Sequence, residues 1–459
     1  MPNVKFLVFI SIASALGGLL WGFDAIVISG ARQPVIDQFA LSANWEGFFV
    51  SSGLLGAVIG SALSGIFADR FGRAKSLLLA AIFLFVSALG SAYANSIELL
   101  TFMRWFGGLG VGLSAMVCPL YLSEISPAHL RGRLVTVFQF AITLGIMIAL
   151  FSNYGITQWA SSIADKVAPE SFAKWFIVDE TWRAMFATEL IPGVIFLVMA
   201  FFLPESPRFL VKKGQHEKAA IVLGRIFKSG VDKQLSAIQE NLSQEAAAKV
   251  PFATIFKKPY IKPLLIGIAL AAFAQFSGIN VVFYYGTSML ESAGFKADSA
   301  LSGLAIIGFF NMIFTTVAML FVDKFGRRKL LFIGTVGCIA CLVGISSSFN
   351  ENGSSLLIIM MCAFVAFFAF SLGPIKFIFA SEIFPSNIRS YAMSMVILTM
   401  WATDTIVAQF TPALRDGIGV NYTFLLFAVI LIPQLYLIWK HMPETAGKTL
   451  EEIELNYKK

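Results

Sequence analysis

The chain has 459 residues, of which 57% are hydrophobic and only 13% are charged, and it carries a formal net charge of +7. A soluble protein of ordinary composition carries about 25% charged residues, so this composition excludes the soluble class. Apolar stretches of about 20 residues, the length needed to cross the hydrocarbon core of a bilayer, recur along almost the whole chain. We therefore expect an all-α protein with many membrane spans.

Twelve spans are predicted, and in chain order they cover residues 6–30, 46–68, 75–95, 98–120, 132–156, 183–203, 260–290, 300–322, 329–349, 355–380, 390–412 and 420–442. A polar segment separates the first six spans from the last six, and its helical periodicity indicates short cytoplasmic helices. The expected domains are an N-terminal six-helix bundle at 1–203, a helical linker at 204–259, a C-terminal six-helix bundle at 260–443 and a cytoplasmic tail at 444–459.

The basic residues are distributed unevenly about these spans. Most of the 34 Lys and Arg residues fall in loops and tails on one side. Cytoplasmic loops of membrane proteins carry such an excess, so we expect both termini in the cytoplasm and the protein in the inner (plasma) membrane. The same distribution explains the net charge without a nucleic-acid partner.

One carboxylate, Asp24, lies deep inside the first apolar stretch. A charge at membrane depth costs roughly 3 kcal/mol even on a lenient insertion scale, so such groups are usually paired and functional. Arg104 lies inside the fourth span. With a rise of about 1.5 Å per residue, both side chains fall in the same half of the bilayer, which makes them candidate partners.

The two halves of the chain repeat each other. Two short motifs recur at nearly the same offset: DRFGR at 69–73 and DKFGR at 323–327, and SEISP at 123–127 and SEIFP at 381–385. PES at 204–206, after the sixth span, is likewise echoed by PET at 443–445, after the twelfth. Three matches in the same order indicate an internal duplication. Two parallel six-helix repeats with a binding site between them are typical of transporters.

The ordered set of motifs resembles the sugar porter family of the major facilitator superfamily, most closely the bacterial xylose and hexose proton symporters. The motifs that carry the resemblance are GFD at 22–24, Arg104 followed by GGLGVG at 107–112, PESPR at 204–208, QFSGIN at 275–280 and PETAGKTLEE at 443–452. The resemblance implies the major facilitator fold, with two pseudo-symmetric six-helix bundles joined by a cytoplasmic helical linker.

The resemblance also implies a function, which is import of a monosaccharide with a proton by alternating access. In this family the positions of Asp24 and Arg104 form the proton-coupling pair. Passive members tend to carry Asn where this chain has Asp24, which favours symport. A static ion pair, a passive sugar facilitator and a transporter-like sugar receptor remain as alternatives. The expected partners are the sugar, the proton and the lipid bilayer, and we expect a monomer.

Matching positions imply a set of sugar-binding residues: Gln139, Gln275, Asn280, Tyr284, Asn311 and Trp401, with Trp21 and Phe377 flanking the cavity. Amides and aromatic rings suit a ring of hydroxyl groups. The chain departs from the family pattern at Ala274, Ile146 and Met400, where amides are usual, and at Phe377, where Trp is usual. These departures leave the identity of the sugar open.

Two unusual charges, Lys376 and Asp404, lie within the tenth and eleventh spans. Lys376 is compatible with snorkelling of its ammonium group to the interface. Alternatively, one of the two binds a charged or unusual sugar, or Asp404 is a second proton site. We keep both residues as candidates for specificity.

The resemblance further implies gating charges at the cytoplasmic ends of helices, which form salt bridges between the bundles. They are Asp69, Arg73, Glu124, Arg131, Glu205, Arg208, Asp323, Arg327, Glu382, Arg389 and Glu444. Their plainer interpretation is topology determination. No phosphate loop, nucleophile motif or metal-ligand cluster appears in the sequence, so we expect neither an enzyme nor a cofactor nor a metal.

Overall fold

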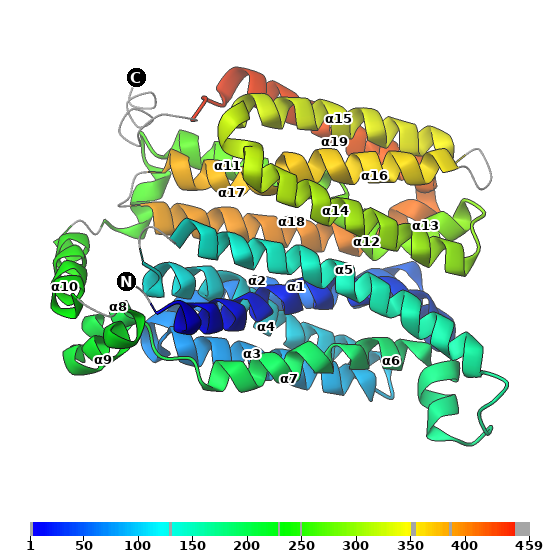
Figure 1. The fold of residues 1–459 in the computed structure, drawn as a ribbon. Helices are drawn as coiled ribbons and strands as arrows, with labels where there is room; N and C mark the ends of the chain where they lie inside the picture. Colours follow the sequence, from blue (N-terminus) through cyan, green and yellow to red (C-terminus); the bar gives the residue numbers. More distant parts are fainter. Residues whose placement is uncertain are drawn as a thin grey trace. The chain divides into compact units, whose positions relative to one another are not determined.

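The computed structural model describes residues 3–127, 131–227, 230–247, 250–349, 355–384 and 388–445. This described part is helical and contains no strand. Twelve of its helical segments are long and apolar enough to cross a membrane, which confirms the twelve predicted spans (Figure 1). The protein is therefore a multi-pass membrane protein.

The first half of the chain forms six spans. Its elements are α1 (Val4–Phe39), α2 (Ala43–Phe71), α3 (Arg73–Ala92), α4 (Ile97–Ile125), α5 (Arg131–Ile163), a π-helix η1 (Lys174–Asp179), α6 (Thr181–Thr188) and α7 (Leu190–Phe201). The last two helices together make the sixth span. The polar segment that follows forms three short helices and a 3-10 helix: α8 (Pro207–Lys212), α9 (His216–Ile226), α10 (Val231–Ala247) and η2 (Phe252–Phe256).

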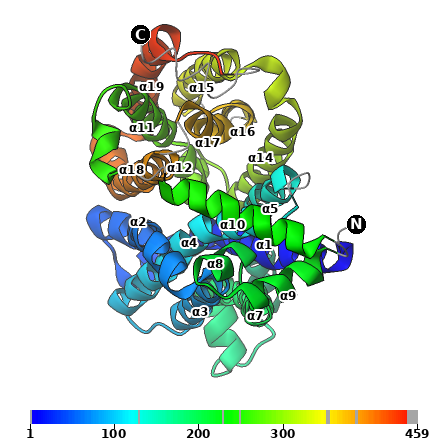
Figure 2. The same cartoon turned by 90° about the vertical axis from the view of Figure 1, so that its left-hand side faces the viewer.

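The second half forms the other six spans. Its helices are α11 (Ile261–Phe276), α12 (Ile279–Tyr284), α13 (Gly286–Ser292), α14 (Ala297–Phe325), α15 (Arg327–Ser348), α16 (Ser355–Phe370), α17 (Leu372–Ile383), α18 (Arg389–Ile418) and α19 (Val420–His441). In Figure 2, α15, α16, α17 and α19 of this half are seen nearly end-on. Packing of α15 against α16 and α19 builds much of its core.

The seventh span is interrupted at Gly278. This residue has φ +76° and separates α11 from α12. Glycine adopts this left-handed conformation without the steric cost that a side chain would add. A Cβ at this position would also lie 2.4 Å from the ring of Phe427. The break therefore depends on glycine, and it sets Gln275 and Asn280 on either side of an irregular turn.

The chain packs as two compact units that do not coincide with the two sequence halves. Unit 1 comprises Met1–Ala25, Leu55–Ile146 and Phe186–Lys249, and unit 2 comprises Ile26–Leu54, Met147–Met185 and Val250–Lys459. Helices α1, α2 and α5 each contribute one end to each unit. The domain boundaries expected from the sequence stay a prediction.

In unit 1, α2 and α4 approach so closely that backbone meets backbone. A Cβ at Gly56 would lie 2.0 Å from the carbonyl oxygen of Trp105, and a Cβ at Gly112 would lie 2.2 Å from that of Ala57. Small residues at helix crossings in membranes permit close van der Waals packing. These glycines have that role here.

Gly56 and Gly65 lie on the same helix and provide a matched test of this packing. We expect Gly56→Ala to lower the thermal unfolding temperature of the purified protein, because overpacking costs about 1–3 kcal/mol. A Cβ at Gly65 meets nothing within 4 Å, so Gly65→Ala should leave the unfolding temperature unchanged or slightly higher. Equal effects of the two substitutions would contradict this role for Gly56.

Candidate functional site

Asp24 on α1 and Arg104 on α4 lie together inside unit 1. Arg104 Nη1 is 3.7 Å from Asp24 Oδ1, and the two side chains are only 4% and 8% exposed, respectively. The Arg104 guanidinium also lies 5.6 Å from the centre of the Phe186 ring. The structure thus brings the expected pair together, while its role in proton coupling stays a prediction.

A third charge, Glu189, belongs to the same cluster and was missed by sequence reasoning. It follows the last residue of α6, is 2% exposed and interacts electrostatically with Asp24 and Arg104. A signal was available, because Glu189 lies inside the predicted span 183–203. We call these three residues the Asp24 cluster. It holds two buried carboxylates and one guanidinium.

A second buried network lies in unit 2, where α11 and α12 pack against α18. The Asn280 side-chain amide donates hydrogen bonds to Gln275 Oε1 at 3.1 Å and to Asp404 Oδ2 at 2.7 Å. The Tyr284 hydroxyl donates to the same Asp404 oxygen at 3.3 Å. We call these four residues the Asp404 cluster. Three of them are predicted sugar ligands, and the fourth is a predicted specificity residue.

Lys376 faces this cluster from α17. Its side chain is buried, and its ammonium nitrogen lies 5.7 Å from the centre of the Phe368 ring. Asp404 attracts its charge. The burial argues against simple snorkelling of Lys376 to the interface.

The other predicted sugar ligands are distributed over both units. In unit 2, Asn311 on α14 and Trp401 on α18 are buried. In unit 1, Gln139 is half-buried, and the Trp21 ring lies 6.3 Å from the Phe138 ring. Phe377 lies in α17, but its side chain is outside the described part of the structure.

The duplicated motifs form matching charge networks, one in each unit. In unit 1, Arg73 Nη2 lies 2.8 Å from Glu124 Oε1, and Glu205 Oε1 accepts a 2.8 Å hydrogen bond from the backbone N–H of Arg73. In unit 2, Arg327 Nη2 likewise lies 2.8 Å from Glu382, and Glu444 accepts a 2.8 Å hydrogen bond from the Arg327 N–H. The internal repeat is thus also present in the contacts.

Two further predicted gating residues, Asp69 and Arg389, make contacts that the structure describes. Asp69 lies 3.3 Å from Arg73, and Arg389 donates a 3.1 Å hydrogen bond to the carbonyl oxygen of Phe384. The side chains of Arg131 and Asp323 are outside the described part. All described ion pairs among the gating set join residues of the same unit. Bridges between the bundles stay a prediction.

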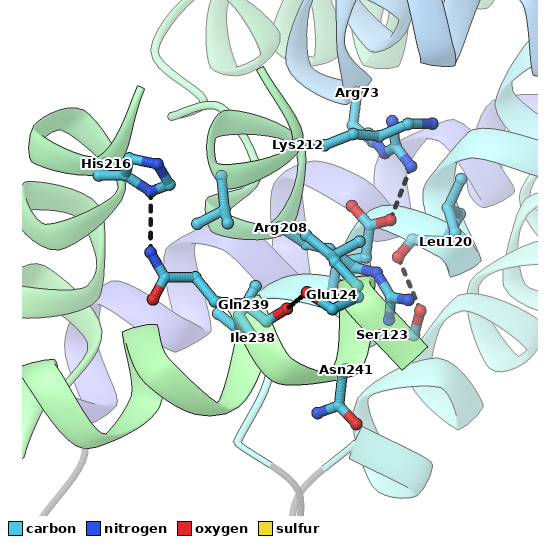
Figure 3. A pocket seen from close by; sticks show the side chains of 13 residues that line it. Arg73, Leu120, Ser123, Glu124, Arg208, Lys212, His216, Ile238, Gln239 and Asn241 are labelled. Carbon is cyan, nitrogen blue, oxygen red and sulfur yellow. Dashed lines mark hydrogen bonds and ion pairs between the residues drawn. The ribbon is translucent and has the colours of Figure 1, made fainter. Parts of the chain in front are cut away.

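A pocket of about 870 Å³, lined by polar and apolar side chains, adjoins the first charge network (Figure 3). Arg73 and Glu124 line it together with Arg208 of α8, His216 of α9 and Gln239 of α10. Beside it, burial raises the pKa of Glu205, and hydrogen bonds from three backbone N–H groups offset part of that rise. The pocket lies between the linker helices and the ends of α3 and α4, and neither the Asp24 cluster nor the Asp404 cluster lines it.

A third buried charge cluster, also missed from the sequence, joins helices of the two sequence halves within unit 2. Glu46 at the start of α2 forms an ion pair with the fully buried Arg32 of α1. Arg415 of α18 binds both Glu46 oxygens, each at 3.1 Å. Nearby, the Ser51 hydroxyl donates a 2.8 Å hydrogen bond to Gln409. We call Arg32, Glu46 and Arg415 the Glu46 clamp.

Comparison with known proteins places these features in context. Residues 10–457 match the family described as sugar (and other) transporter. The glucose transport protein of Synechocystis sp. is 38% identical over 98% of this chain and 97% of that protein. The arabinose-proton symporter of Bacillus subtilis is 36% identical, over 98% and 95% of the two chains. The D-xylose-proton symporter of Escherichia coli is 33% identical, over 98% and 96%.

Solved structures agree with this result. The partially occluded inward-open conformation of the xylose transporter from E. coli matches with a TM-score of 0.82 and 32% identity, covering 97% of this chain and 100% of that chain. An inward-open conformation of the same transporter matches with a TM-score of 0.81 and 31% identity, covering 98% and 99%. The expected fold is therefore confirmed.

The Glu46 clamp generates a prediction about stability. Glu46→Gln leaves Arg32 buried without its carboxylate, and breaking a buried pair in this way costs about 3–5 kcal/mol. We expect a clear fall in the thermal unfolding temperature. Glu98→Gln, an exposed carboxylate on α4, is the matched control and should have little effect.

A double variant separates the charge effect from a packing effect. Arg32→Leu combined with Glu46→Leu removes both buried charges and should recover much of the lost stability. A double variant that is as unstable as Glu46→Gln would show that the clamp does not act through charge compensation.

Proposed function

Because the chain belongs to the sugar transporter family, we propose that it imports a monosaccharide together with a proton by alternating access. The observation that carries this proposal is the composition of the Asp24 cluster, which has two buried carboxylates for one guanidinium. Two of its relatives, the arabinose-proton and D-xylose-proton symporters, support proton coupling.

The charge balance of the cluster gives a reason for proton binding. Arg104 compensates one of the carboxylates Asp24 and Glu189, and the other would be an isolated buried anion. The effective penalty for burying an uncompensated ion is several kcal/mol, so a dry cluster holds one proton. When the cluster is hydrated, the second carboxylate ionises and the proton leaves. Alternation between these two states would couple one proton to each cycle.

The available energy is sufficient for accumulation. One elementary charge that moves down 100 mV releases about 2.3 kcal/mol. At about 1.36 kcal/mol per factor of ten, this corresponds to roughly 50-fold accumulation of the sugar.

We propose that sugar binding uses the Asp404 cluster, together with Asn311 and Trp401 of the same unit. In unit 1, Gln139 and Trp21 stay predicted sugar contacts. Sugar hydroxyls both donate and accept hydrogen bonds, so they suit the amide and hydroxyl groups of this set. The Trp rings provide flat apolar faces. The Glu46 clamp would open and close during the cycle, since it ties ends of α1 and α2 to α18. We further propose a plasma-membrane monomer with cytoplasmic termini.

The proton role is tested in liposomes that contain the purified protein. With an inward proton gradient, we expect accumulation of a labelled pentose or hexose to depend on the gradient. Asp24→Asn should abolish accumulation, because the cluster then has one carboxylate for Arg104 and needs no proton. Exchange of labelled for unlabelled sugar should persist in this variant.

Glu98→Gln, with its exposed side chain, is the control and should accumulate sugar as the wild type does. Wild-type uptake that ignores the gradient would assign the protein to passive facilitation. Accumulation that survives Asp24→Asn would remove Asp24 from the coupling mechanism.

A further inference from the structure

The Asp404 cluster has an unusual balance of hydrogen-bond donors and acceptors. Asn280 uses its side-chain nitrogen for two bonds, to Gln275 and to Asp404. An amide nitrogen has two N–H donors, so both are engaged and only the Asn280 oxygen remains for a ligand. Gln275 retains its own amide nitrogen as a donor. The face of the cluster that a ligand can use therefore includes the Asn280 acceptor and the Gln275 donor.

Asp404 adds a further acceptor to this face. Both hydrogen bonds that it accepts end on Oδ2, and Oδ1 accepts none from the described residues. The side chain is only 3% exposed, so Oδ1 has few alternatives in water. A carboxylate that served only to fix helix packing would be expected to engage both oxygens. One oxygen of Asp404 is left to accept from a ligand.

Lys376 sets the net charge around the cluster. It is 9% exposed, it lies on α17, which packs against α18, and its charge is attracted by Asp404. Because one buried anion attracts one buried cation, the two charges compensate each other. An added ligand charge of either sign would be left uncompensated, which is unfavourable at low dielectric.

We propose that Asp404 is a specificity-determining sugar contact, balanced by Lys376, which selects neutral sugars that donate hydrogen bonds and excludes both sugar acids and amino sugars. The inference rests on the proposed sugar transport and names its substrate class. Asp404 accepts a sugar hydroxyl through Oδ1, and Lys376 cancels its charge. Asn280 and Tyr284 hold the carboxylate in place through Oδ2.

A second proton site is the competing role for Asp404. Two hydrogen-bond donors and a nearby ammonium group all stabilise the ionised carboxylate. These partners oppose the cost of burying the charge, which is the largest effect on Asp404, and on our proposal they keep the carboxylate ionised through the cycle. On this assignment the proton belongs to the Asp24 cluster alone.

Competition assays test the proposal in liposomes that contain the full-length protein. Uptake of a labelled neutral sugar is measured against unlabelled neutral sugar, a uronic acid and a protonated amino sugar at about pH 6, where a free carboxyl group is ionised. For the wild type, we expect the neutral sugar to compete at least about tenfold better than either charged sugar.

Single variants should shift this preference in opposite directions. Asp404→Asn leaves Lys376 uncompensated, so the uronic acid should gain at least about tenfold relative to the neutral sugar. Lys376→Met leaves Asp404 uncompensated, so the amino sugar should gain instead. The double variant restores neutrality and should again prefer the neutral sugar. Asp37→Asn, an exposed carboxylate on α1, is the control and should keep the wild-type profile.

The possible outcomes are distinct. A wild type that transports no sugar overturns the proposed function and this inference with it. A wild type that transports neutral sugar, with variants that keep its profile, overturns only this inference. A lower proton-to-sugar ratio in Asp404→Asn with an unchanged profile also overturns it, because Asp404 is then a proton site. If one single variant does not fold, the opposite shift in the other decides the question.

Discussion

Charges that a helix carries into an apolar environment must be compensated there, and this constraint determines how the chain is built. Among the described residues, buried charges have partners of opposite charge in the Asp24 cluster, around Asp404 and Lys376, and in the Glu46 clamp. Their charge balances differ. The Asp24 cluster has one more anion than cation, Asp404 and Lys376 carry opposite charges, and in the Glu46 clamp the second cation, Arg415, also pairs with Asp416 at 2.8 Å. Only the first balance calls for a bound proton, which is why we assign coupling to it.

The internal duplication shows which features both halves require and which are specific to one of them. The networks around Arg73 and Arg327 have the same ion pair and the same backbone hydrogen bond to a glutamate. The Asp24 and Asp404 clusters have no such correspondence. One is built from a carboxylate pair and an arginine, and the other from amides, a phenol and a carboxylate. Duplicated motifs thus accompany a shared scaffold, while the two clusters proposed to bind the proton and the sugar differ in composition.

Much of this could be predicted from the sequence. Hydropathy alone located the twelve spans, because each needs about 20 apolar residues and nothing else in the chain competes with them. A lone carboxylate in an apolar stretch identified Asp24, and depth along the helices indicated Arg104 as its partner. The motif resemblance selected Gln275, Asn280 and Tyr284, which the structure brings together in one network with Asp404.

Other parts could not be predicted, for physical reasons. The Glu46 clamp joins residues far apart in sequence, and Arg32 and Glu46 lie near predicted span ends, where charges are ordinary. Glu189 was visible as a charge in a span, but its proximity to Asp24 depends on how α6 and α7 pack in unit 1. The hydrogen bond between Asn280 and Asp404 likewise depends on how α12 packs against α18.

The central claim is that the excess carboxylate of the Asp24 cluster binds one proton for each sugar transported. The most direct measurement sets a sugar gradient against an opposing proton gradient in liposomes and finds the ratio at which net sugar flux is zero. The account predicts a balance point that corresponds to one proton per sugar. A balance point that is independent of the proton gradient would contradict proton coupling, and one that corresponds to two protons would contradict the assignment of a single proton to this cluster.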